Sequence, residues 1–205
     1  MEKNKKADNV LDFRKTTFWG VAASISACPD SDKPEVVLSG KSNVGKSSLL
    51  NALGDNKKLA RVSQSPGKTR QVVYFEVDGE FYIADLPGYG YAKAPKQEKE
   101  KFSKLVDQYF ASGRPISLIL HLLDIRHLPS KEDMGMISYM QSNAMPFFIV
   151  FTKCDKLSRS QMLTNARDIL KYLQIGDIPS FCVSADKKAG LDDLREAIVG
   201  RIFPS

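Results

Sequence analysis

The sequence predicts an α/β fold in which a mostly parallel central sheet, with one antiparallel strand, has helices on both faces. Short apolar runs bounded by turn residues alternate with longer amphipathic stretches. This alternation is typical of a parallel sheet covered by crossover helices. The pair Asp78-Gly79 lies between two of the apolar runs and suits a tight hairpin turn, which predicts the antiparallel strand.

The strands are predicted at the apolar runs, several of which are apolar enough to be buried on both faces. In chain order these runs are residues 35–38, 72–77, 81–84, 117–123, 147–151 and 180–183. The helices are predicted at the amphipathic stretches 46–53, 97–112, 130–142, 158–173 and 191–202. Sheets of this kind bind ligands at the carboxyl ends of their strands, where loops lead into helices.

A glycine-rich motif stands at the first of these strand ends. The pattern GxxxxGK[ST] is matched between a predicted strand and a predicted helix by Gly40, Lys41, Ser42, Asn43, Val44, Gly45, Lys46 and Ser47. Its glycines let backbone amides curl around a phosphate, the helix N-terminus adds its positive dipole, and Lys46 adds a full charge. The hydroxyl of Ser47 is then a ligand for Mg²⁺. A phosphate loop alone serves kinases, ATPases and GTPases alike.

A second motif ends the strand predicted at residues 81–84. The DxxG pattern is matched by Asp85, Leu86, Pro87 and Gly88. This motif places Asp85 beside the magnesium ion and the Gly88 amide near a γ-phosphate. Between the two motifs, Thr69 is a candidate to complete the Mg²⁺ shell. The alternative is a solvated loop threonine, and the residues alone leave both interpretations open.

The third motif follows the strand predicted at residues 147–151. Thr152, Lys153, Cys154 and Asp155 match [NT]KxD. A carboxylate accepts hydrogen bonds from both N1–H and the exocyclic amine of guanine, whereas adenine offers no such pair of donors. Backbone amides of Val183, Ser184 and Ala185, at the end of the last strand, are placed to bind guanine O6. In this order the motifs predict a P-loop GTPase with a Ras-like fold.

Several longer segments carry a more specific resemblance. They are PEV (34–36), GKSNVGKSSLLN (40–51), PGKTR (66–70), DLPGYGYAK (85–93) and LDIRH (123–127). From about Phe18 to about Ile202 the sequence resembles the EngB (YihA/YsxC) family of bacterial-type GTPases, relatives of Era within the translation-factor-like class.

The resemblance implies which residues contact GTP and what the protein does. Besides the three motifs, it implies nucleotide contacts from Gly67, Lys68, Thr69, Arg70 and Gln71, and Mg²⁺ held by Ser47 and Thr69. It also implies a role in assembly of the large ribosomal subunit and a link to cell division and septation. Lys41 and Lys68 replace arginines that are common in the family, and Arg70 replaces a common glutamine.

The residue after DxxG bears on catalysis. Ras-like enzymes have a glutamine there that orients the attacking water, and this sequence has Tyr89. The sequence therefore predicts slow GTP hydrolysis that a partner or a cation accelerates. Asn43 resembles in position the asparagine of potassium-stimulated relatives, so K⁺ is a possible cofactor; the alternative is a loop residue that tolerates turn geometry. The candidate catalytic residues are Lys46, Asn43 and Thr69.

Composition and charge bear on partners and location. The net charge is +6, and basic residues cluster in 57–70 and 93–104, which favours polyanions such as RNA but equally suits a solvated surface. No apolar run approaches the ~20 residues that span a bilayer, and residues 1–6 lack the apolar core of an export signal. We therefore expect a cytoplasmic protein. The cysteines form no CxxC pair, so neither a disulfide framework nor a zinc site is supported, and His121 is interpreted as a core histidine.

The chain of 205 residues is expected to hold a flexible or peripheral arm at 1–17 and a single GTP-binding domain at 18–205. The expected partners are a guanine nucleotide and the large ribosomal subunit, through its RNA or proteins, without DNA or membrane, and the chain is expected to be monomeric. Two alternatives stay open. One is an RNA- or ribosome-docking switch in which hydrolysis is incidental; the other is a P-loop ATPase or kinase, which has no use for the motif at 152–155.

Overall fold

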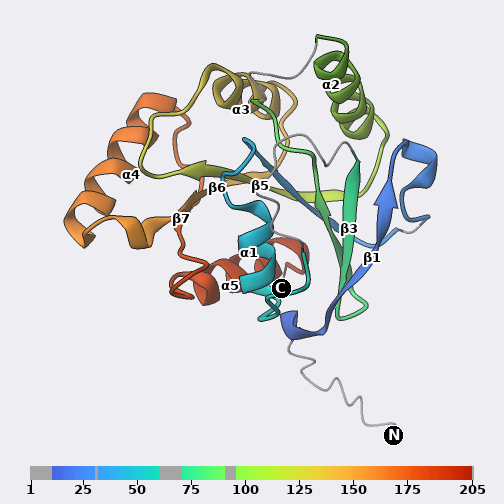
Figure 1. Ribbon diagram of the computed structural model, residues 1–205, viewed down its shortest axis with the longest axis horizontal. Coiled ribbons are helices and arrows are strands. Elements are labelled where there is room, and N and C mark those ends of the chain that lie inside the picture. Colours follow the sequence, from blue (N-terminus) through green and yellow to red (C-terminus); the bar gives the residue numbers. More distant parts are fainter. Residues whose placement is uncertain (1–10, 31, 61–70, 91–95, 205) are drawn as a thin grey trace, which may run out of the picture.

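The computed structural model describes residues 11–30, 32–60, 71–90 and 96–204 of the chain (Figure 1). In this part a seven-stranded sheet has the order β1-β3-β4-β2-β5-β6-β7. β3 runs antiparallel to both its neighbours, and the other pairs are parallel, which confirms the predicted sheet. The strands are β1 (Thr16–Ala22), β2 (Glu35–Gly40), β3 (Val72–Val77), β4 (Phe81–Asp85), β5 (Ile116–Asp124), β6 (Phe147–Thr152) and β7 (Ser180–Cys182).

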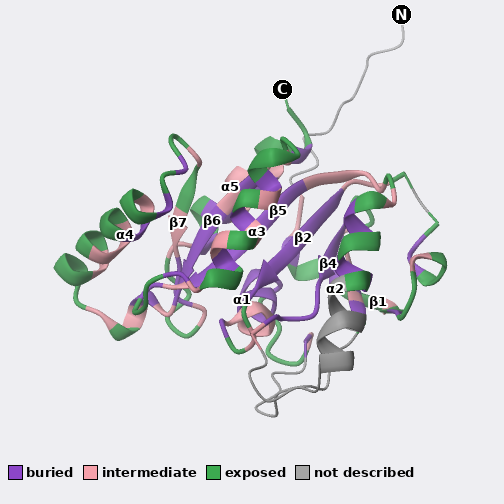
Figure 2. Cartoon of the chain, turned by 90° about the horizontal axis from the view of Figure 1, so that it is seen from above, coloured by how far each residue is buried: buried purple, intermediate pink, exposed green. Residues whose placement is uncertain are grey.

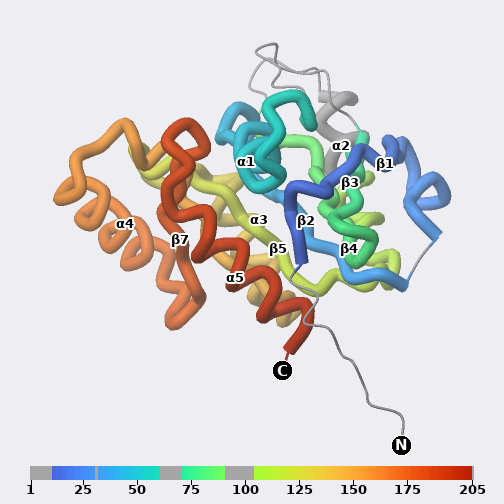
Figure 3. Tube along the Cα trace, turned by 90° about the horizontal axis from the view of Figure 1, so that it is seen from below, coloured from blue at the N-terminus to red at the C-terminus, as the bar shows by residue number. Residues whose placement is uncertain are grey.

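Helices cover both faces of the sheet, as the sequence predicts. α1 (Lys46–Leu53) and α5 (Leu191–Ile202) lie side by side on one face, and in Figure 3 they lie in front of the strands. The opposite face carries α2 (Lys96–Ala111), α3 (Lys131–Ser142) and α4 (Arg159–Leu173). Short 3-10 helices occur at η1 (Phe13–Lys15), η2 (Ile25–Ala27) and η3 (Cys154–Lys156).

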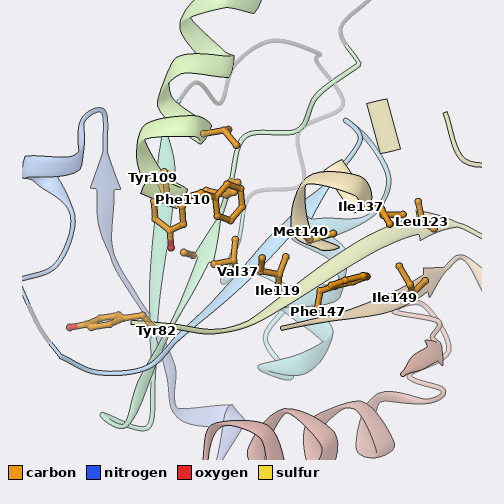
Figure 4. Close-up of a cluster of buried hydrophobic side chains, with 14 of the residues drawn as sticks. Val37, Tyr82, Tyr109, Phe110, Ile119, Leu123, Ile137, Met140, Phe147 and Ile149 are labelled. Atoms are coloured by element: carbon orange, nitrogen blue, oxygen red, sulfur yellow. The ribbon is translucent and has the colours of Figure 1, made fainter. Parts of the chain in front are cut away.

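Each face of the sheet has its own apolar core, because successive side chains of a strand point to opposite faces. Strand β2 is buried along its whole length, and the central strands form the buried layer in Figure 2. Val37 of β2 joins the core under α2 and α3, where it lies near Ile119 and Met140 (Figure 4). Val36 and Leu38 join the core under α1 and α5. Pairing with β4 and β5 fixes the register of β2 and therefore where the loop after it emerges.

The predicted hairpin joins β3 to β4. Asp78 and Gly79 have φ of 50° and 74°, the positive φ that a type I′ turn requires at its two central positions, and the Glu80 amide donates 2.9 Å to the Val77 carbonyl. The Asp78 carboxylate also accepts a 3.0 Å hydrogen bond from the Asp12 amide and forms a 2.8 Å ion pair with Lys15 Nζ. The turn therefore anchors the segment that leads into β1.

Strand β1 was not predicted from the sequence. It lies at the edge of the sheet, and only its two end residues, Thr16 and Ala22, are buried. A register irregularity between Phe18 and Gly20 breaks the alternation that would mark a strand. Phe13, just before β1, is buried and packs edge-on against a β4 phenylalanine, so ordered structure begins inside the range predicted as an arm.

Side-chain caps set the starts of α3 and α4. Ser130 and Ser158 each form a capping box with the third residue of the following helix, so α3 and α4 begin one residue after the predicted starts.

Among the described residues, no helix combines the length and the apolarity that crossing a bilayer requires.

Candidate functional site

The glycine-rich loop between β2 and α1 has the backbone of a phosphate loop. Gly40 and Gly45 have φ of 150° and 118°, and Asn43 has φ of 62°. A Cβ on Gly40 would lie 2.8 Å from the carbonyl oxygen of Leu122, so only glycine fits against the neighbouring strand β5. Gly45 is the N-cap of α1 and offers no side-chain cap. The first amides of α1 are therefore available to an anion, and the helix dipole favours one.

A buried acidic group lies beside the loop. Parallel pairing sets Asp85, the last residue of β4, opposite Leu38 of β2. Lys46 Nζ lies 3.8 Å from Asp85 Oδ1, which is within ion-pair range but beyond hydrogen-bonding range. Among the described residues, Oδ1 has no hydrogen-bond partner although it is buried, and burial raises the pKa of Asp85 against the opposing charge of Lys46.

That unpartnered oxygen fits a bound cation. Magnesium prefers oxygen ligands and is usually held through one or two protein groups plus phosphates and water. Ser47 is the second residue of α1, next to Lys46, and supplies a hydroxyl at the same strand end. Asp85 and Ser47 are therefore a donor set of the right chemistry for Mg²⁺.

The DxxG segment packs directly on the phosphate loop. The Ser42 amide donates a 2.8 Å hydrogen bond to the carbonyl oxygen of Tyr89. A Cβ on Gly88 would lie 2.9 Å from the Ser42 amide nitrogen and 3.1 Å from Lys46 Nζ. Such a close approach explains why the position after Pro87 is glycine. The structure brings the first two predicted motifs together.

The third motif reaches the same loop from β6. Thr152 Oγ1 donates 2.7 Å to the carbonyl of Val44. Lys153 has φ of 60°, and its Nζ donates 2.9 Å to the Asn43 carbonyl while lying 2.9 Å from Asp124 Oδ2. The lysine side chain thus spans from the end of β6 to the phosphate loop.

Asp155 is held as an ionised hydrogen-bond acceptor. Its pKa is lowered first by a hydrogen bond from Lys156 and then by one from Ser184, whose hydroxyl donates 2.7 Å to Oδ1. Ser184 belongs to the segment Val183–Ala185, so the two predicted base-reading segments are in contact. The Val183 carbonyl also accepts from the amide of Cys154 at 3.3 Å.

A cavity of about 750 Å³ lies between these segments and α1. This volume is typical of ligand pockets in proteins. The predicted site residues in its lining come from the phosphate loop, the motif at 152–155 and the last strand end: Gly45, Thr152, Lys153, Asp155, Val183 and Ala185. Gln71 is exposed, whereas Gly67, Lys68, Thr69 and Arg70 lie outside the described residues.

Sequence reasoning missed the role of Asp124. Despite burial, hydrogen bonds from Arg126 and Lys153 hold the pKa of this carboxyl well below its usual range. An ionised Asp124 therefore fixes the side chain of Lys153. The signal was present, since Asp124 ends an apolar strand in the segment LDIRH, at the same sheet edge as the other motifs.

The sequence of this chain matches those of known GTP-binding proteins. Residues 35–153 match the family described as 50S ribosome-binding GTPase. A probable GTP-binding protein EngB from Streptococcus pyogenes serotype M5 (strain Manfredo) is 36% identical over 196 residues, covering 95% of this chain and 98% of the relative. The chain belongs to the EngB family of GTP-binding proteins. A relative from serotype M49 (strain NZ131) has the same identity and coverage.

Solved structures agree with the EngB assignment. The crystal structure of a probable EngB matches with a TM-score of 0.69 at 20% identity, covering 82% of this chain and 98% of that one. A variant of Era from Aquifex aeolicus bound to GDP and AlF4⁻ matches with a TM-score of 0.68 at 26% identity, covering 82% of this chain and 57% of Era. Together, the family and structure matches show that the chain has this fold and a P-loop. They also show that it belongs to a GTPase family that binds guanine nucleotides.

Proposed function

We propose that this EngB family member is a guanine-nucleotide-controlled switch that hydrolyses GTP slowly and acts in assembly of the large ribosomal subunit, on which normal cell division then depends. The observation that carries the proposal is the meeting of three motifs at one sheet edge. Lys153 Nζ reaches the Asn43 carbonyl at 2.9 Å, and the Tyr89 carbonyl accepts from the Ser42 amide at 2.8 Å. Phosphates and base then have distinct, adjoining binding groups.

In this proposal the loop 40–47 and the segment 85–88 hold the phosphates, while Asp155 and Val183–Ala185 hold the base. Residues 67–71 also contact the nucleotide. Ser47 and Thr69 hold Mg²⁺ with Asp85 nearby, and the ion, when bound, neutralises charge that develops on the phosphates. Asp155 is suited to guanine because it is ionised and already oriented by Ser184.

Slow hydrolysis follows from the environment of Tyr89. Its hydroxyl already donates to Asp133, so it is not free to orient a water molecule. A cation or a partner must therefore complete the site, with Lys46, Asn43 and Thr69 as the catalytic residues. If K⁺ bound near Asn43 is that cation, turnover in KCl exceeds turnover in NaCl at equal ionic strength. Equal rates would remove K⁺ from the proposal.

The ribosomal partner is supported by two comparisons and by charge. The matched family is described as ribosome-binding, and a structure of Era, 24% identical to this chain, was solved with part of 16S ribosomal RNA. Around the nucleotide cavity, Lys57, Lys187 and Lys188 are exposed lining residues. Exposed lysines bind RNA phosphates by releasing counterions. A ribosome-assembly role places the protein in the cytoplasm.

The first experiment measures affinity for fluorescent GDP and GTP with Mg²⁺, with ATP as competitor. Selective guanine binding that Asp155→Ala abolishes is the expected result. Asp168→Ala is the matched control, because Asp168 is exposed on α4 and pairs with the neighbouring Arg167. Equal competition by ATP would leave a phosphate-binding protein of another class.

The second experiment is co-sedimentation with large ribosomal subunits at several salt concentrations. We expect binding that depends on whether a GTP analogue or GDP is present, and that weakens steeply as salt rises. Binding that ignores the nucleotide would favour the alternative in which the protein docks on RNA and hydrolysis is incidental. No binding in either state would remove the ribosomal partner.

A further inference from the structure

Two cysteines lie at the two base-reading segments, next to each other in the fold. Cys154 is the third residue of Thr152–Asp155, and Cys182 is the last residue of β7, directly before Val183–Ala185. Parallel pairing sets Cys182 opposite Phe151, and the Cys154 amide donates to the Val183 carbonyl at 3.3 Å. Both side chains pack in the core under α4. The Cys154 thiol donates at 3.3 Å to the Phe151 carbonyl, which also accepts from the Val183 amide at 2.8 Å, so this thiol lies beside the end of β7.

The two thiols differ in exposure and in acidity. Cys182 is half-buried, whereas Cys154 is 8% exposed. Interaction with the other thiol lowers the pKa of Cys182 and raises the pKa of Cys154, whose burial acts in the same direction. Because the thiolate is the reactive form of cysteine, Cys182 is the sulfur that an oxidant attacks first, with Cys154 as the adjacent resolving thiol.

We propose that Cys154 and Cys182 are an oxidation site at which peroxide forms a reversible disulfide, and that this disulfide weakens guanine-nucleotide binding. This inference rests on the proposed role of residues 152–155 in reading guanine. The Cys182 thiolate attacks one peroxide oxygen, the O–O bond breaks, and Cys182 becomes a sulfenic acid. Cys154 then loses its proton and attacks that sulfur, so that an S–S bond forms and the S–O bond breaks. Two thiols are oxidised, and one hydrogen peroxide is reduced to two water molecules.

The effect on the nucleotide follows from geometry. A disulfide has an S–S length of about 2.05 Å, which is shorter than any thiol–thiol hydrogen bond. Forming it draws η3 toward the end of β7. Asp155 follows Cys154 directly, and its Oδ1 is oriented by Ser184, two residues after Cys182. The contraction therefore changes the spacing between the two segments that hold the base.

The test compares reduced, peroxide-treated and re-reduced protein. Mass spectrometry is expected to show a loss of about 2 Da and a peptide pair linked through Cys154 and Cys182. Fluorescent GDP is expected to bind about tenfold more weakly after oxidation, a change of about 1.4 kcal/mol, and to recover after reduction. Cys182→Ser and Cys154→Ser are expected to lose both responses. Cys28→Ser, which alters the thiol that contacts Ser24 instead, is expected to keep both.

The outcomes separate the inference from the proposed function. Failure to form the Cys154–Cys182 disulfide overturns the inference, and so does a disulfide that leaves GDP affinity unchanged. Reduced protein that does not bind GDP overturns the proposed function and, with it, the nucleotide part of this inference. A response that persists in Cys182→Ser assigns the effect to another residue and also overturns the inference.

Discussion

The hydroxyl of Tyr89 donates a 2.5 Å hydrogen bond to Oδ1 of Asp133, the third residue of α3. The other oxygen of this carboxylate, Oδ2, accepts from the amide and the hydroxyl of Ser130 in the capping box of α3. The Tyr89 carbonyl accepts from Ser42 in the phosphate loop. One buried tyrosine therefore connects the phosphate loop to the first turn of α3.

Replacing Tyr89 by phenylalanine tests that connection. The variant Tyr89→Phe keeps the ring but leaves Oδ1 of Asp133 without its donor in a buried site. An unpaired buried acceptor of this kind costs about 1–3 kcal/mol. We expect the free energy of unfolding, measured by urea denaturation, to fall by about 2 kcal/mol.

The control for this variant is Tyr172→Phe. Tyr172 lies on α4 and is 50% exposed, so losing its hydroxyl is expected to change stability by less than about 0.5 kcal/mol. Equal stability losses in the two variants would mean that the Tyr89 hydrogen bond contributes nothing specific.

His121 makes stability depend on pH. It is fully buried on β5, with its Nε2 3.4 Å from the Tyr89 hydroxyl and 3.9 Å from Asp133 Oδ1. Burial lowers the pKa of His121 from 6.5 to about 4, and the more distant charge of Asp133 only partly opposes this. His121 therefore binds a proton near pH 6.5 in the unfolded chain but only near pH 4 in the folded chain.

The sign follows from this difference. The contribution of His121 to the free energy of unfolding is fully present above pH 6.5 and is lost as pH falls toward about 4. Its maximum is near 3 kcal/mol, since each pKa unit corresponds to about 1.4 kcal/mol. Urea denaturation between pH 7.5 and 4.5 is expected to show this slope, and His121→Gln is expected to flatten it. His127→Gln is the control, because His127 is exposed and should leave the slope unchanged. A slope that survives His121→Gln would assign it to other groups.

The motifs were predictable because each is local. A fully buried strand followed by glycines and a lysine identifies β2, its loop and α1 without any tertiary information. The contacts between motifs were not predictable in the same way. Lys153 and Asn43 are 110 residues apart, and only the order of the strands brings them together.

Two other features left no readable pattern. β1 lies at a sheet edge with a register irregularity, so its exposed Phe18, Trp19 and Val21 show no alternation of buried and exposed positions. The cluster of Tyr89, His121 and Asp133 comes from a loop, a strand and a helix, and of the three only Tyr89 adjoins a motif. His121 was predicted to be a satisfied core or strand-edge histidine; it is buried in the core, but its Nδ1 has no hydrogen-bond partner among the described residues.

The bridge made by Lys153 is expected to support nucleotide binding. In Lys153→Met the hydrogen bond to the Asn43 carbonyl and the ion pair with Asp124 are both lost, while the aliphatic length of the side chain is retained. We expect GDP affinity to fall by at least about tenfold, because the hydrogen bond from Thr152 to Val44 is then left to hold the base-reading segment on the loop. Lys171→Met is the control, since Lys171 is exposed in the last turn of α4. An equal loss of affinity in the control would mean that the Lys153 bridge contributes nothing specific.

The contact between Gly88 and the phosphate loop is tested by adding one methyl group. In Gly88→Ala the new Cβ would lie 2.9 Å from two backbone atoms of Ser42, closer than real Cβ contacts allow, so the segment must move away from the loop. Overpacking of this kind costs about 1–3 kcal/mol of stability. We also expect GTP affinity to fall more than GDP affinity, since Gly88 is the residue proposed to contact the γ-phosphate.

The matched control, Gly135→Ala, is expected to change stability in the opposite direction. Gly135 lies within α3, and a Cβ added there meets nothing within 4 Å. Gly135→Ala is expected to stabilise the protein by up to about 1 kcal/mol, because alanine favours helix over glycine by that amount. Thermal denaturation of both variants, with titrations of GDP and a GTP analogue, checks the pair. If Gly88→Ala matched the wild type in melting temperature and in both affinities, the DxxG segment would not lie against the phosphate loop as the structure has it.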